Sequence, residues 1–246
     1  MENNKLQPEA LFGYFLKICE IPHGSKNEAQ ISAFLQNFGK ELGYETIADS
    51  VGNVLIKKPA APGYEDRKTI ILQSHMDMVC DKRPDVEHDF TKDPIRMYVD
   101  GDFVKAKGTT LGADNGIAVA MVLAILESDE VGHPPIEAVF TSDEEIGMLG
   151  ALKLDTGILN GCRMINLDVG CSSEAIISCA GGSDVLIRIP VERKYVFGKK
   201  ITITLKGLKG GHSGGAIICG RVNANILTPS SNCAYFSDAQ KNSNNN

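Results

Sequence analysis

The residues of this chain that could do chemistry are carboxylates and imidazoles at the ends of short apolar runs. The run IILQSHMD at residues 70–77 places a histidine and an aspartate two positions apart. Positions i and i+2 of a strand share a face, so Asp77 is expected beside the imidazole of His75. A metal-bound histidine usually gives its second N–H to a carboxylate or a carbonyl. Taken alone, such a pair is more often an ordinary polar strand end.

Three further acidic sites have a similar setting. Asp114 lies in the glycine-punctuated segment GTTLGADNG, directly before an apolar helical run, where an aspartate commonly caps the helix. In a water-poor cleft the same carboxylate could bridge two cations. Asp143, Glu144 and Glu145 follow another apolar run, and acid runs of this kind are usually solvated turns. Asp168 ends the short run INL.

Helices and strands in alternation connect these sites. Helical spacing of apolar residues predicts helices over 8–19, 28–42 and 117–126. Short β-rich runs predict strands over 54–56, 69–72, 136–141 and 164–167. This order predicts an α/β sandwich built on a mainly parallel central sheet. Open α/β sheets bind ligands beyond the carboxyl ends of their strands, so the acidic and imidazole sites are expected to meet there.

The pattern changes near Ser183. Alternating strands are predicted over 185–189 and 201–205, followed by a Gly-rich run around His212. We therefore expect three regions, which are a catalytic metal-binding domain over 1–182, the beginning of an α+β lid or dimerisation domain over 183–227, and a disordered tail over 228–246.

Composition excludes several classes of function. The formal net charge of −6 and the interspersed charges argue against a nucleic-acid partner. No apolar stretch approaches the ~20 residues of a membrane span, and the N-terminus does not start a signal peptide, which predicts a cytoplasmic protein without a membrane partner. Seven cysteines without a CxxC pair fit reduced thiols. The phosphate-loop and GxGxxG patterns are absent, which argues against nucleotide binding.

The combined motifs point to a metal site and to a family. Histidine, aspartate and glutamate without cysteine suit Zn²⁺ with oxygen-rich ligation, and Mn²⁺ and Co²⁺ stay open as alternatives. The order SHMDMV, GTTLGADNGIAVA, EAVFTSDEEIGMLGA and INLD resembles the M20-type metallopeptidases. The longer sequence around these motifs, together with the opening FLKICEIPHGSKNE, is similar to the bacterial aminoacyl-histidine dipeptidases, also called cytosol non-specific dipeptidases. The match runs from Pro8 to Asn225.

The resemblance implies an active site with two zinc ions. It implies that His75 and Asp168 hold one metal, that Glu145 holds the other, and that Asp114 bridges them. Two cations bridged by one carboxylate lower the pKa of a shared water and polarise a scissile carbonyl. The implied activity is metal-dependent hydrolysis of dipeptides with a free amino terminus, including Xaa-His.

Three residues receive other roles from the resemblance. Asp77 would steady His75. Glu144 would be the general base, which takes a proton from water and later protonates the leaving amine. His212, in a Gly-Gly-His-Ser-Gly segment of the lid, would stabilise the developing oxyanion, often across a homodimer. The alternative interpretation is that His212 is an ordinary histidine in a flexible turn, without a catalytic role.

The sequence departs from the family pattern in two places. Val169-Gly170-Cys171 follows Asp168, where family members carry further acidic residues. Family members are also longer, and the final histidine that binds metal opposite Glu145 has no counterpart after His212. We therefore expect weak occupancy of the second metal position and little activity from these 246 residues. The alternatives are an M20 aminoacylase or tripeptidase, and a catalytically dead metal-binding or dimerisation fragment.

Overall fold

The chain divides into two units, Met1–Ser172 and Ser173–Asn246. The computed structural model describes residues 6–170, 173–179, 181, 183, 185–195, 197–199, 202–211 and 216–227. The helices and strands of the first unit follow one another in the order α1 (Glu9–Cys19), α2 (Ala29–Glu41), β1 (Glu45–Ala48), β2 (Val54–Lys58), β3 (Ile70–His75), β4 (Met97–Asp100), β5 (Phe103–Ala106), α3 (Ala113–Glu127), β6 (Ile136–Thr141), α4 (Leu149–Lys153), the 3-10 helix η1 (Thr156–Ile158) and β7 (Arg163–Asn166).

Five strands form the central sheet, in the order β1-β2-β6-β3-β7. β3 runs parallel to both β6 and β7, β2 runs antiparallel to β6, and β1 runs antiparallel to β2. Within this sheet, all strands except β2 therefore point in the same direction. This confirms the predicted α/β fold on a mainly parallel sheet. The register pairs His75 at the end of β3 with Thr141 at the end of β6. The residues that follow these two strands therefore emerge side by side.

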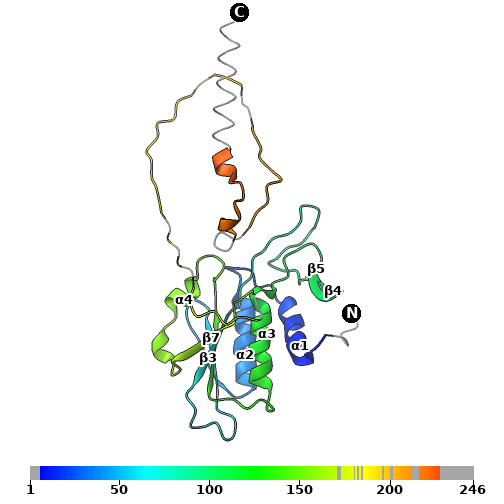
Figure 1. Ribbon diagram of the computed structural model, residues 1–246, viewed down its shortest axis with the longest axis vertical. Helices are drawn as coiled ribbons and strands as arrows, with labels where there is room; N and C mark the ends of the chain where they lie inside the picture. The colour runs from blue at the N-terminus through cyan, green and yellow to red at the C-terminus, as the bar shows by residue number, and fades with distance from the viewer. Residues whose placement is uncertain are drawn as a thin grey trace, which may run out of the picture. The chain divides into compact units, whose positions relative to one another are not determined.

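Helices α1, α2 and α3 cover one face of the sheet (Figure 1). α2 and α3 lie against the strands, and α1 packs on α3. In β2, Val54 and Ile56 face this helical layer while Leu55 faces the other side, as the two-residue period of a strand requires. The opposite face has a smaller apolar cluster, in which Leu154 and Ile158 from the α4–η1 segment cover Leu55.

The sequence predicted the helices of the first unit well. α1, α2 and α3 confirm the three predicted helices, although α3 begins earlier than the apolar run alone indicates. α3 is 15 residues long and buries most of its apolar side chains. Among the described helices, none has the length and apolar composition that a bilayer crossing requires.

The two strands predicted for the second unit are not found among its described residues. The structure assigns no strand to residues 185–189 or 202–205. The side chains of Val185 and Ile187 are 80% and 75% exposed, so they have no apolar layer to pack on. Strand pairs without such a layer are marginally stable in water. Ile201, the predicted tail over 228–246 and His212 lie outside the described residues.

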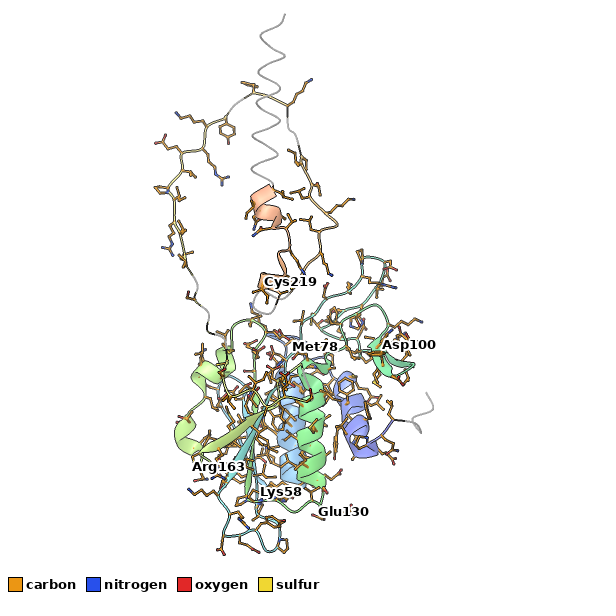
Figure 2. The ribbon with its side chains drawn as sticks, viewed as in Figure 1. Lys58, Met78, Asp100, Glu130, Arg163 and Cys219 are labelled. Atoms are coloured by element: carbon orange, nitrogen blue, oxygen red, sulfur yellow. The ribbon has the colours of Figure 1, made fainter. Side chains whose placement is uncertain are left out.

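The ends of the sheet can be located in Figure 2. Met78, which follows β3, lies at the carboxyl end of the parallel strands. Lys58, which ends the antiparallel β2, and Arg163, which begins β7, lie at the opposite end. The acidic residues singled out in the sequence follow β3, β6 and β7 or lie in the first turn of α3, and they therefore belong to the end that Met78 marks.

Candidate metal centre

His75 is the buried centre of the candidate site. It is the last residue of β3 and only 1% of its surface is exposed. Its Nδ1 lies 3.3 Å from Oδ1 of Asp77 and 3.0 Å from the carbonyl oxygen of the same residue. Asp77 lies in the loop after β3 and not in the strand itself. The predicted contact is therefore present, but it does not arise from two residues on one face of a strand. The contact fixes the imidazole and leaves Nε2 facing the carboxyl end of the sheet.

Asp114 faces His75 and does not cap α3. The helix begins after Gly112, and no side chain caps it. Asp114 is extended, with φ −85° and ψ 106°, but among the described residues its carboxylate accepts no backbone N–H, so the capping interpretation was wrong. Its Oδ1 lies 3.1 Å from Nε2 of His75. Gly112 permits this turn because its φ is +72° and a Cβ atom there would lie 2.8 Å from Sδ of Met78.

The predicted base Glu144 and the predicted ligand Asp168 both lie near the same nitrogen. Oε2 of Glu144 and Oδ2 of Asp168 each lie 3.9 Å from Nε2 of His75. Two sets of ligand atoms, each within 4.8 Å of one another, share this histidine. One set adds Asp114 and Glu145, and the other adds Glu144 and Asp168. Adjacent glutamates therefore contribute to different sets.

The charges of this cluster favour a bound cation. Burial, and the negative charges of neighbouring carboxylates, raise the pKa of Glu144, Glu145 and Asp168. Burial alone would lower the pKa of His75, but the hydrogen bond to Asp77 and the charges of Asp77, Asp168 and Glu144 outweigh it and raise this pKa to about 9. A cation would remove the repulsion between the carboxylates, and one imidazole with several carboxylate oxygens is a donor set that suits Zn²⁺ or Mn²⁺. The residues present therefore fit a metal.

Asp77 also organises the acidic turn after β6. Its Oδ1 accepts a hydrogen bond from the backbone N–H of Glu144 at 3.0 Å, and its Oδ2 accepts one from the N–H of Glu145 at 3.2 Å. Asp77 is 1% exposed. Burial raises the pKa of such a carboxyl, but the hydrogen bonds from His75, Glu144 and Ser25 more than compensate, and the pKa of Asp77 falls below its ordinary value. Asp77 is thus held as a carboxylate.

Several residues that support this site are not indicated by any local sequence pattern. The hydroxyl of Ser25 donates to Oδ2 of Asp77 at 2.8 Å, and Oε1 of Glu28 accepts the N–H of Asp143 at 3.0 Å. Burial, and the side-chain carboxyl of Asp143 beside it, raise the pKa of Glu28 to about 7, although the hydrogen bond from the backbone N–H of Asp143 lowers it. His23 is buried nearby, and burial lowers its pKa. These contacts join segments far apart in the chain, so no local spacing could have indicated them.

Comparisons with known proteins identify relatives of this chain. The family model described as Peptidase family M20/M25/M40 matches residues 71–206. The cytosol non-specific dipeptidase of Escherichia coli is 47% identical over 228 residues, which cover 92% of this chain and 47% of that protein. The aminoacylhistidine dipeptidase structure from Vibrio alginolyticus aligns with a TM-score of 0.67 and 50% identity, over 69% of this chain and 34% of that one.

A more distant structure has the same fold. The aminopeptidase PepT of Bacillus cereus aligns with a TM-score of 0.54 and 26% identity, over 65% of this chain and 43% of that one. The chain thus spans about half the length of its E. coli relative. The matched residues include β3, the start of α3, the acidic turn after β6 and β7, which together form the cluster around His75. The chain belongs to peptidase family M20/M25/M40.

Proposed function

We propose that this chain forms the metal-binding part of a dipeptidase that hydrolyses dipeptides with a free amino terminus, including Xaa-His. The observation that carries the proposal is the pair of ligand sets that share His75, at the end of β3. The names of the E. coli and V. alginolyticus relatives, which are dipeptidases, support the substrate class. The name of the E. coli relative also supports a place in the cytoplasm.

Two metal ions, with zinc as the first candidate, would be held by this cluster. We assign His75 and Asp168 to one ion, Glu145 to the other, and Asp114 to both. When bound, the pair of cations activates a water molecule and polarises the scissile carbonyl. The buried Asp77 holds the imidazole of His75 in place from the side of Nδ1.

Glu144 acts as the general base in this proposal. Its carboxylate takes the proton of the attacking water and later delivers it to the leaving amine. Burial and the nearby carboxylates raise its pKa, which brings its proton affinity closer to what a base at neutral pH needs. The backbone N–H of Glu144 donates to Asp77, which anchors the residue without using its side chain. His212 is proposed to stabilise the oxyanion, and a homodimer is the proposed assembly.

The experiment loads the purified protein with Zn²⁺ or Mn²⁺ and measures release of free histidine from Ala-His and β-Ala-His. A tripeptide and an N-acetyl amino acid serve as competing substrates, because they distinguish a tripeptidase or an aminoacylase from a dipeptidase. Hydrolysis of the dipeptides alone is the expected result for the protein extended to the length of its relatives. Preference for the tripeptide or the acylated amino acid would contradict the assigned substrate class.

For the 246 residues alone we propose weak binding of the second metal and slow hydrolysis. His75 can serve one ion, which leaves Asp114 and Glu145 for the other, whereas a catalytic zinc normally has three protein ligands. Metal analysis of the purified polypeptide after dialysis tests this proposal. Two full equivalents of zinc per chain would contradict it.

A further inference from the structure

The loop between α1 and α2 crosses the carboxyl end of the sheet beside the metal centre. The backbone N–H of Met78 donates to the carbonyl of His23 at 3.1 Å, and the N–H of Ser25 donates to the carbonyl of Met78 at 3.3 Å. Gly24 and Met78 form a parallel bridge between these backbone contacts. A segment that contributes no ligand to either set around His75 is therefore fixed to the loop that carries Asp77.

Two side chains of this loop contact the network that holds the acidic turn. The hydroxyl of Ser25 donates to Oδ2 of Asp77 at 2.8 Å, the same oxygen that accepts the N–H of Glu145. Oε1 of Glu28 accepts the N–H of Asp143 at 3.0 Å, and Glu28 is 9% exposed. Ser25 and Glu28 thus reach the turn from two sides, one through Asp77 and one directly.

Asp143 occupies a backbone conformation that needs this support. Its φ is +51°, in the left-handed region that L-residues other than glycine rarely adopt. Besides the contact to Glu28, its Oδ1 accepts the N–H of Lys26 at 2.9 Å, and Lys26 itself has φ +68°. Because Asp143 directly precedes Glu144, its conformation sets the direction in which the chain enters the two glutamates.

Glu28, Asp77 and Asp143 are themselves close enough to hold a cation, but four of their six carboxylate oxygens already accept hydrogen bonds. Both oxygens of Asp77 accept hydrogen bonds, and so do Oε1 of Glu28 and Oδ1 of Asp143. Every donor in these contacts is an N–H or an O–H group. In these contacts the cluster acts as a hydrogen-bonded support of the turn.

We infer that Ser25 and Glu28 are positioning residues that fix the 142–145 turn and thereby set both the metal affinity of Glu145 and the placement of Glu144. The inference rests on the proposed function for the role of Glu144, and on the geometry alone for metal affinity. Supporting residues behind metal ligands typically change affinity or activity by about 10- to 100-fold when they are removed.

The test measures Zn²⁺ affinity by competition with a chromophoric chelator, together with the melting temperature of the metal-free protein. Ser25→Ala and Glu28→Ala are each expected to weaken zinc binding by about tenfold. Glu28→Gln is expected to bind zinc within about threefold of the wild type, because its amide oxygen can still accept the N–H of Asp143. Glu130→Ala, at the end of the sheet remote from Met78, is the control (Figure 2).

Each outcome decides the inference. The inference is overturned if Ser25→Ala and Glu28→Ala bind zinc as tightly as the wild type. It is also overturned if Glu28→Gln loses as much zinc affinity as Glu28→Ala. If Glu28→Ala does not fold, Ser25→Ala decides. Failure of the protein extended to the length of its relatives to hydrolyse dipeptides, although it binds zinc, refutes the proposed function, while the affinities still decide the role of the two residues. A wild type that binds no zinc refutes both. In an active protein, kcat should fall in Ser25→Ala with KM nearly constant.

Discussion

Nε2 of His75 lies 3.1 Å from Oδ1 of Asp114, a residue 39 positions further along the chain. The contact joins the end of β3 to the irregular start of α3, where Asp114 leaves the helical conformation. The imidazole is buried, whereas 73% of the Asp114 side chain is exposed. The carboxylate can therefore contact His75 and still offer oxygen to a second partner, which is what a bridging ligand requires.

Replacing Asp114 should affect two metals and replacing His75 should affect one. Asp114→Ala is expected to lower the occupancy of both positions, because a bridging carboxylate serves two ions. His75→Ala should chiefly empty the position that it shares with Asp168. Metal analysis of both variants, in the protein extended to the length of its relatives, gives the stoichiometry. Two full equivalents of metal in Asp114→Ala would refute the bridging role.

Replacing Glu144 should separate catalysis from metal binding. Glu144→Gln keeps the size of the side chain but removes its ability to take up a proton. Turnover of Ala-His is expected to fall by about 100-fold or more, since general base catalysis contributes about 10²- to 10⁴-fold. The metal content should match that of the wild type, and Glu130→Gln should retain full activity. A turnover number within about threefold of the wild type would remove Glu144 from the mechanism.

The first unit shows how far local patterns predict this protein. The run before His75 predicts β3 because apolar and β-branched residues follow one another, and the helical spacing predicts α1 and α2 equally directly. The meeting of the acidic residues follows from the strand directions, since parallel strands end at one edge. The directions of the strands were therefore sufficient to predict that the candidate ligands meet at one edge of the sheet.

The failures have physical reasons that a local pattern does not contain. Asp114 was open to a capping interpretation because its neighbours read as a helix start, but the chain turns at Gly112 and directs the carboxylate toward His75. The contact of Ser25 with Asp77 spans 52 positions and that of Glu28 with Asp143 spans 115. Such pairs depend on how the α1–α2 loop lies over the sheet, which only the folded chain determines.

Replacing Asp77 with asparagine should weaken the metal centre without a change in size. The carboxylate has His75 Nδ1 and the Glu144 N–H on one oxygen, and the Ser25 hydroxyl and the Glu145 N–H on the other. An amide has one acceptor oxygen, so Asp77→Asn must place an N–H₂ group against one of these pairs.

Zinc affinity of Asp77→Asn is expected to fall by about 10- to 100-fold. The free energy of unfolding of the metal-free protein should fall by about 1–3 kcal/mol, the cost of leaving a buried donor unpaired. Chelator competition and urea denaturation measure the two effects. Asp102→Asn, on the exposed turn between β4 and β5, is the matched control. Wild-type affinity and stability in Asp77→Asn would show that the network tolerates an amide.

Glu28 should make the stability of the metal-free protein depend on pH. Its pKa in the folded protein is about 7, against an ordinary value of 4.5, because of burial and the side-chain carboxyl of Asp143 beside it. The folded state therefore holds the proton more tightly than the unfolded state. This contribution to stability is fully present below pH 4.5 and is lost as the pH rises through about 7.

Glu28→Gln isolates this effect because its amide does not titrate and its oxygen can still accept the N–H of Asp143. We expect the melting temperature of the wild type, measured with a chelator present, to fall relative to that of Glu28→Gln as the pH rises from 4.5 to 7. The difference should then stay constant at higher pH, because Glu28 is fully ionised in both the folded and the unfolded state. Glu130→Gln should follow the wild type throughout. Parallel curves for the wild type and Glu28→Gln would mean that the carboxyl of Glu28 ionises at its ordinary pKa, and that burial beside the Asp143 carboxyl does not favour the protonated form.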